Sequence, residues 1–77
     1  MEEQKEFKKV KAPIIGADGN VFNLIGICQK ELRKEGYTKE AKELSDRVLR
    51  CGLYQEALAI MEEYVIPTTS NDYDDEM

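Results

Sequence analysis

The stretch GADGNVF (residues 16–22) decides the fold of this 77-residue chain, because it joins a β-branched segment to an amphipathic one. Two glycines, an aspartate and an asparagine within five positions are typical of a turn. Asn20 stands directly before the apolar run, where its side-chain oxygen can accept hydrogen bonds from the free N–H groups of a helix start. We therefore expect the chain to reverse direction here and to begin a helix at Val21.

The same loop invites comparison with two kinds of ligand site. A calcium loop that used Asp18 and Gly19 as its fifth and sixth positions would need oxygen ligands where the chain has Ile14, Gly16 and Ile25. A phosphate loop would need a different glycine spacing or a Gly-Lys-Ser/Thr ending, and Asp18 would repel the anion. We therefore interpret the loop as a structural turn and helix cap.

Three helices are predicted downstream of this turn. Apolar residues recur at helical spacing through residues 21–35, namely Val21, Leu24, Ile25, Cys28 and Leu32. Gly36 can end this first helix. Thr38 can cap a second helix, which Gly52 stops. A third helix follows in YQEALAIMEEYV (residues 54–65).

The segments that flank the helices are predicted to form a small sheet. VKAPII (residues 10–15) is short and partly β-branched, and Pro13 would confine it to an edge. Residues 64–66 either end the third helix or form a strand, and we expect the strand because all three are β-branched or aromatic. The predicted fold is α+β and mainly helical: a three-helix domain with a short two-stranded antiparallel sheet that pairs the segments before the first helix and after the third.

This organisation predicts a single small domain over residues 9–67. Residues 1–8 are polar and are expected to form a flexible N-terminus. Residues 68–77 (TTSNDYDDEM) carry too few apolar side chains to pack and are expected to form a disordered acidic tail. The formal net charge of −5 argues mildly against general affinity for nucleic acid.

Composition excludes several kinds of chemistry. The chain has no histidine, so catalysis by Ser–His or Cys–His pairs and histidine-ligated zinc are ruled out. No signal-peptide core or membrane-length apolar run is present, which favours the cytoplasm and reduced thiols at Cys28 and Cys51. The carboxylates lie mostly on polar helix faces, so we expect no enzyme activity, cofactor or metal.

Two groups of residues are candidates for contact with a partner. Phe22 and Ile27 lie off the main apolar stripe of the first helix, and with Tyr54 they would form an apolar patch if exposed. The alternative is that the N-terminal strand covers them. Lys30, Arg33 and Lys34 could contact nucleic acid, helped by the N-terminal lysines.

At residues 11–37 and 52–67 the chain resembles a group of small uncharacterised bacterial proteins of phages, conjugative elements and other mobile DNA. The motif that carries the resemblance is GxDGNxFxLxG, which starts at Gly16 and precedes a helix with a basic end. The resemblance implies a setting and brings no activity or ligand.

We expect a non-enzymatic accessory or regulatory protein of a mobile genetic element that acts through protein–protein contacts. Its partner would be an unknown protein of the host or of the element, with no membrane involved and with the oligomeric state open. Two alternatives stay open: a small nucleic-acid-binding regulator that uses the basic end of the first helix, and an acidic inhibitor that mimics nucleic-acid charge.

Overall fold

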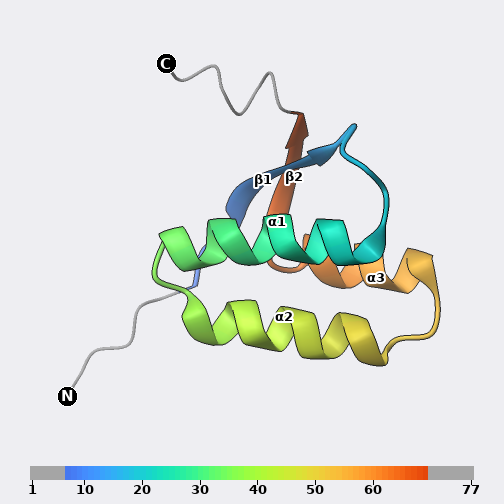
Figure 1. Ribbon diagram of the computed structural model, residues 1–77. Coiled ribbons are helices and arrows are strands. Elements are labelled where there is room, and N and C mark those ends of the chain that lie inside the picture. Colours follow the sequence, from blue (N-terminus) through green and yellow to red (C-terminus); the bar gives the residue numbers. More distant parts are fainter. Residues whose placement is uncertain (1–6, 70–77) are drawn as a thin grey trace.

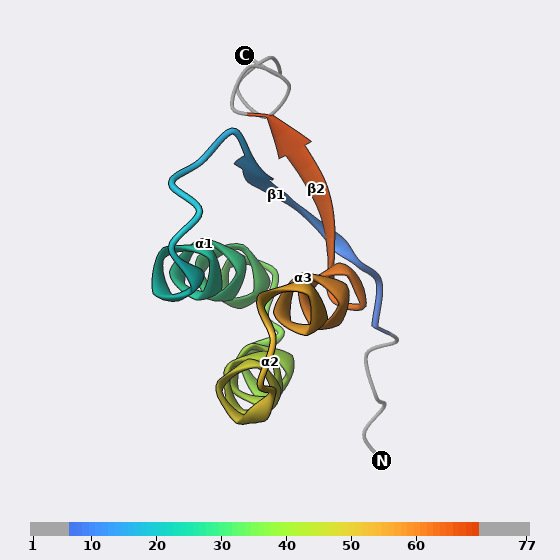
Figure 2. The same ribbon diagram turned by 90° about the vertical axis from the view of Figure 1, so that its right-hand side faces the viewer.

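A computed structural model describes residues 7–69 of the chain, and these form five elements. In chain order they are β1 (Val10–Ile15), α1 (Val21–Lys34), α2 (Thr38–Arg50), α3 (Tyr54–Glu62) and β2 (Val65–Thr69). All three helices lie on one side of the sheet (Figures 1 and 2). Helices α1 and α3 run beneath β1 and β2, and α2 closes the layer below them. The three helices and the mainly helical α+β class are confirmed.

The predicted antiparallel pairing of the two strands is wrong. Val10 pairs with Val65, Lys11 with Ile66 and Ala12 with Pro67, so residue numbers rise together and the strands are parallel. The physical reason is that no hairpin joins the two strands. Three helices lie between them, and a long helical crossover allows β2 to enter the sheet in the same direction as β1.

Asn20 caps α1 as its position predicts. The backbone at Asn20 is extended, and its side-chain oxygen accepts hydrogen bonds from the N–H groups of Phe22 at 2.8 Å and Asn23 at 3.4 Å. Asp18 supports this arrangement, because its carboxylate accepts from the Asn20 N–H at 3.1 Å. The GADGNVF loop is therefore held by its own polar side chains.

The junction between α1 and α2 explains why Thr38 does not act as a cap. The Gly36 N–H donates to the Arg33 carbonyl at 3.0 Å, and the Tyr37 N–H donates to the Leu32 carbonyl at 2.8 Å. With Gly36 at φ 87°, this is the Schellman ending of α1. Tyr37 then serves as the N-cap of α2 without a side-chain hydrogen bond, and Thr38 is already helical. The predicted Thr38 cap is wrong because Tyr37, which completes the ending of α1, is already the N-cap of α2, so Thr38 falls inside the helix.

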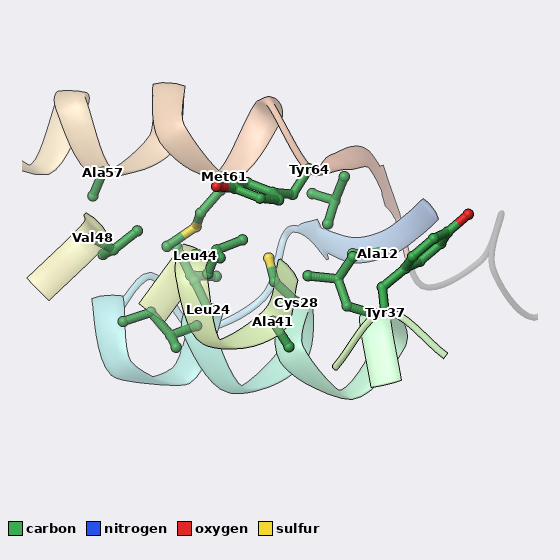
Figure 3. Close-up of a cluster of buried hydrophobic side chains, with 13 residues drawn as sticks. Ala12, Leu24, Cys28, Tyr37, Ala41, Leu44, Val48, Ala57, Met61 and Tyr64 are labelled. Atoms are coloured by element: carbon green, nitrogen blue, oxygen red, sulfur yellow. The ribbon is translucent and has the colours of Figure 1, made fainter. Parts of the chain in front are cut away.

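One apolar core joins the helices to the sheet (Figure 3). The largest fully buried side chains come from four of the five elements: Leu32, Leu44, Met61, Val65 and Cys28. Tyr37 and Tyr64 add buried rings on the side nearest β1. The apolar positions predicted to face inward on α2 are buried at Ala41, Leu44 and Val48.

The two strands extend the ordered packing at both ends of the predicted domain. Helix α3 ends at Glu62 and β2 begins at Val65, so the strand interpretation is confirmed for residues 65 and 66, while Tyr64 lies in the connecting turn. The strand continues through Thr68 and Thr69, two residues into the segment interpreted as tail. Phe7, placed in the polar N-terminus by the sequence, packs against the core. Residues 1–6 and 70–77 lie outside the described part.

Candidate protein-binding surface and basic cleft

The start of α1, the end of α2 and the start of α3 meet at one end of the helical layer (Figure 1). Four large apolar side chains are exposed there: Phe22 (67%), Leu49 (55%), Leu53 (61%) and Tyr54 (49%). We call these four residues the apolar end. Single exposed apolar residues are normal on a protein surface, whereas a group of four from three adjoining elements is typical of a contact site.

The register between α1 and α2 brings Phe22 and Leu49 to the same level. The two helices are antiparallel, and the Gln29 side-chain amide donates to the Ala41 carbonyl at 3.1 Å. Seven residues earlier on α1, or two helical turns, Phe22 lies at the level of Val48 and Leu49. A shallow groove of about 240 Å³ beside them supports this register, since Val21 and Val48 both line it.

Tyr54 ties α3 to the turn before α1. Its hydroxyl donates to the Gly19 carbonyl at 2.8 Å, across 35 residues of sequence. A Cβ added at Gly19 would lie 3.2 Å from that hydroxyl oxygen, so the glycine makes room for the contact. The hydroxyl is therefore engaged within the chain, while about half of the side chain stays exposed beside Leu53.

The structure separates Ile27 from the other two predicted patch residues. Ile27 is half-buried against the core and is not an exposed patch residue. It follows Phe22 by five residues, which is about 140° around the helix. Of the three predicted patch residues, Phe22 and Tyr54 therefore belong to the apolar end and Ile27 does not. Leu49 and Leu53 take its place, and they were missed because their exposure depends on how α2 and α3 meet.

A second feature is an open cleft of about 400 Å³ between the start of β1 and the end of α1. We call it the basic cleft. Its lining includes four lysines and two glutamates with one tyrosine: Lys8, Lys9, Lys11, Lys34, Glu31, Glu35 and Tyr37. Lys34 is thereby brought beside the N-terminal lysines, as the nucleic-acid alternative requires. Lys30 and Arg33 are not part of the lining and lie on the exposed face of α1.

Aromatic contacts and a buried carboxylate shape the cleft. Phe7 packs edge-on against Tyr37, with ring centroids 4.8 Å apart, and against Tyr64 at 6.0 Å. The Tyr37 hydroxyl accepts a hydrogen bond from the Lys8 N–H at 3.2 Å. Glu31 is buried, and its carboxylate lies 3.3 Å from the Lys34 ammonium group. Glu31 therefore neutralises part of the positive charge in the cleft.

Charge is distributed differently in the described domain and at the two ends of the chain. Residues 7–69 contain ten basic side chains (lysine or arginine) and nine acidic ones (aspartate or glutamate). Residues 1–6 and 70–77 together contain one basic and seven acidic side chains. The net charge of −5 therefore arises outside the described domain. The domain itself is close to neutral, and its lysines collect along β1 and the end of α1.

Two carboxylates, Asp46 on α2 and Glu63 directly after α3, form ion pairs at the surface. Arg47 binds Glu63 with two hydrogen bonds, at 2.7 and 3.1 Å, and also donates to the Tyr64 hydroxyl at 3.0 Å. These hydrogen bonds raise the pKa of Arg47 and lower the pKa of Glu63. Asp46 lies 3.8 Å from the Lys42 ammonium group. The arrangement fastens α2 to the start of β2.

The thiols and acids of residues 7–69 show no reactive constellation. Burial, and secondarily Glu31, raises the pKa of the Cys28 thiol to about 12, so it stays protonated at neutral pH. Cys51 is half-buried, and its thiol donates to the Val48 carbonyl at 3.0 Å. Within this range, no three His, Cys, Asp or Glu side chains are grouped to hold a metal ion. No described helix is both long and apolar enough to cross a bilayer.

Both edges of the sheet carry a proline. The Val10 N–H donates to the Tyr64 carbonyl at 3.3 Å, which fixes the alternation of the parallel ladder. In that alternation Pro67 occupies a position of β2 at which other residues would point their backbone N–H away from β1, and proline has none to offer a further strand. Pro13 likewise has no backbone N–H, and it follows Ala12, the last regularly paired residue of β1. Addition of a further strand is therefore disfavoured on either side, and a protein partner has better access to the helices.

Comparisons of the chain with protein-family models, curated proteins and solved structures gave no match. The resemblance carried by the GxDGNxFxLxG motif therefore stays a prediction.

Proposed function

We propose that this chain is a non-enzymatic accessory or regulatory protein that binds another protein through the apolar end. The observation that carries the proposal is the exposure of four large apolar side chains at the end of the helical layer where α1 begins, α2 ends and α3 begins: Phe22, Leu49, Leu53 and Tyr54. Burying aromatic and leucine side chains on a partner supplies the main free energy of such contacts. The predicted resemblance to mobile-element proteins favours a role for this binding in the cytoplasm of a bacterial host.

A capture experiment with Phe22→Asp tests the proposal. The full-length chain is immobilised and exposed to bacterial lysate, and bound proteins are compared with those retained by the variant. Ile66→Asp is the matched control, because Ile66 is another exposed apolar side chain that lies on β2. Circular dichroism confirms that both variants are folded. We expect a partner that is held by wild type and Ile66→Asp and is lost with Phe22→Asp.

The proposal fails if folded Phe22→Asp retains the same partners as wild type. It also fails if Ile66→Asp loses those partners equally, because the sheet face would then carry the contact.

The basic cleft favours a second candidate, a nucleic-acid-binding regulator. If Lys8, Lys9, Lys11 and Lys34 each contacted one phosphate, affinity for duplex DNA would fall about 150-fold as salt rises fourfold. Fluorescence anisotropy with a labelled duplex measures this dependence. Lys9→Glu should weaken binding, and Lys42→Glu on α2 should leave it unchanged. Binding without salt dependence, or equal effects of both variants, would exclude the cleft.

A further inference from the structure

The face of the sheet that points away from the helices is covered by no described element. Side chains alternate along a strand, and the buried Ala12 and Val65 point toward the helices. Lys11 and its pairing partner Ile66 therefore point the other way, and both are exposed. Figure 2 shows all three helices on the opposite side of the sheet. We call this surface the outer face, and its exposed residues are Lys9, Lys11, Ile15 (52%) and Ile66 (46%).

The outer face combines positive charge with exposed apolar area. Among residues 7–69, no ion pair joins a carboxylate to Lys9 or Lys11. Glu63 accepts hydrogen bonds from Arg47, which are the main cause of its lowered pKa, and Lys9 contributes less. Both lysines can therefore take a further carboxylate. Beside them the two isoleucines favour an occupant that also carries an apolar side chain.

Residues 70–77 (SNDYDDEM) have this composition. Four of them are acidic, at positions 72, 74, 75 and 76, and Tyr73 lies among them. The segment continues directly from β2, whose last residue Thr69 pairs with Ile15 at the end of the outer face. It therefore starts beside the surface that it complements.

The acidic side chains are within reach of both lysines. Lys11 lies four residues before Ile15, or about 13 Å along β1. Asp74 is five residues beyond the end of β2, and a chain of that length spans up to about 17 Å. Lys9 is about 20 Å from Ile15 by the same measure, and Glu76 can reach about 23 Å.

Residues 1–6 are the other acidic part of the chain, and they fit the outer face less well. They contain three glutamates and one lysine, whereas residues 70–77 contain four acidic residues and no basic one. They also lead into Phe7, whose ring packs against Tyr37 and Tyr64 on the helical side of the sheet. The segment after β2 is therefore the better occupant.

Going beyond the proposed function, we propose that the outer face is the docking surface of residues 70–77, which fold back over β1 and β2 of their own chain. Asp74 and Asp75 then lie at Lys11. Glu76 lies at Lys9, and Tyr73 covers the isoleucines. Packing on the face, and not at an edge, agrees with the prolines at both edges. Because the segment is tethered beside the face, weak exposed ion pairs suffice to hold it without an apolar core.

Docking would shield part of the basic cleft. Lys9 and Lys11 line that cleft as well as the outer face. A polyanion that binds there has to displace residues 70–77 first. The acidic segment therefore lowers the affinity of the chain for nucleic acid.

Two-dimensional NMR of backbone amides in the full chain tests the docking. Three double variants are compared with wild type: Asp74→Asn/Asp75→Asn, Glu2→Gln/Glu3→Gln, and the charge-matched control Glu43→Gln/Glu56→Gln on α2 and α3. The wild-type signals of Lys11 and Ile66 should move as salt rises from about 20 mM to about 1 M, because salt screens exposed ion pairs. Asp74→Asn/Asp75→Asn should move them the same way at low salt, and the other two variants should leave them in place.

Equal shifts in all three variants, or no shift with Asp74→Asn/Asp75→Asn, overturn the docking. Larger shifts with Glu2→Gln/Glu3→Gln would assign the outer face to residues 1–6. Wild-type shifts that depend on protein concentration would assign it to a second copy. Either result also overturns the proposal.

Fluorescence anisotropy with a labelled DNA duplex tests the shielding. Asp74→Asn/Asp75→Asn should bind about fivefold more tightly than Glu43→Gln/Glu56→Gln, although both variants change the net charge equally. Equal affinities, or no measurable binding by either variant or wild type, overturn the shielding. Loss of partner capture with Phe22→Asp is independent of these outcomes, because the apolar end and the outer face share no residue.

Discussion

Gly26→Ala should stabilise the folded chain. Gly26 is the sixth of the fourteen residues of α1, well inside the helix, and the added methyl group would meet no described atom within 4 Å. The substitution therefore carries the full difference in helix propensity with no steric cost. That difference is about 0.8–1 kcal/mol in favour of alanine. For a domain of this size it corresponds to a rise in Tm of about 3–8 °C.

The assay is thermal and urea unfolding followed by circular dichroism, at a concentration low enough that self-association does not contribute. Gly16→Ala is the matched control, because a Cβ at Gly16 also meets nothing within 4 Å while its φ is 85°. There the same methyl group is strained by the left-handed backbone and should cost about 1–2 kcal/mol. The two alanines should therefore shift the urea midpoint in opposite directions.

A Gly26→Ala variant that is less stable than wild type, with Gly16→Ala behaving as expected, would refute the reasoning. It would mean that some part of the chain contacts α1 at Gly26 in the monomer. The exposed face of α1 at Gly26 would then be an internal packing surface.

Three further predictions concern the core, the thiols and the ion pair. Leu44→Ala should lower the free energy of unfolding by about 2.7–5 kcal/mol, measured in urea, since the side chain is fully buried; a loss below 1 kcal/mol would contradict its place in the core. In the native protein a thiol reagent should label Cys51 and spare Cys28 until urea is added, and equal labelling rates would contradict the burial of Cys28. Arg47 lowers the pKa of Glu63 below its ordinary 4.5, so the stability that the pair supplies is present above that value and is lost as pH falls through the folded pKa. The urea midpoints of wild type and Arg47→Met should therefore converge between about pH 6 and pH 3, and a constant difference would contradict the pairing.

Local sequence patterns predicted the helices because the signals that form them are local. The Asn20 cap and the apolar spacing from Val21 to Leu32 act within one helix, and both appear in the structure. The start of α2 was predicted less well, since Thr38 has the chemistry of a cap but Tyr37 already closes α1 and opens α2. Where two elements share a residue, the choice depends on hydrogen bonds from both.

The candidate surfaces depended on contacts that the sequence does not display. Spacing on one helix could not show whether β1 covers Phe22 or Ile27, and in the structure it leaves Phe22 exposed while Ile27 packs against the core. The basic cleft arises because Lys34 and the β1 lysines, more than twenty residues apart, lie side by side. Hydrophobic and charged residues were identified from the sequence. Their grouping required the tertiary fold.

The direction of β2 could have been derived, and the reason for the error is instructive. Pairing the two ends of a helical domain suggests a hairpin, in which one reversal makes strands antiparallel. The sequence instead carries turn signals around residues 16–20, 35–37 and 51–53, which set three helices between the two strands. A connection of this length and helical content is a crossover, and crossovers join parallel strands. The connection thus favours the parallel direction, whereas strand propensity alone carries no information about it.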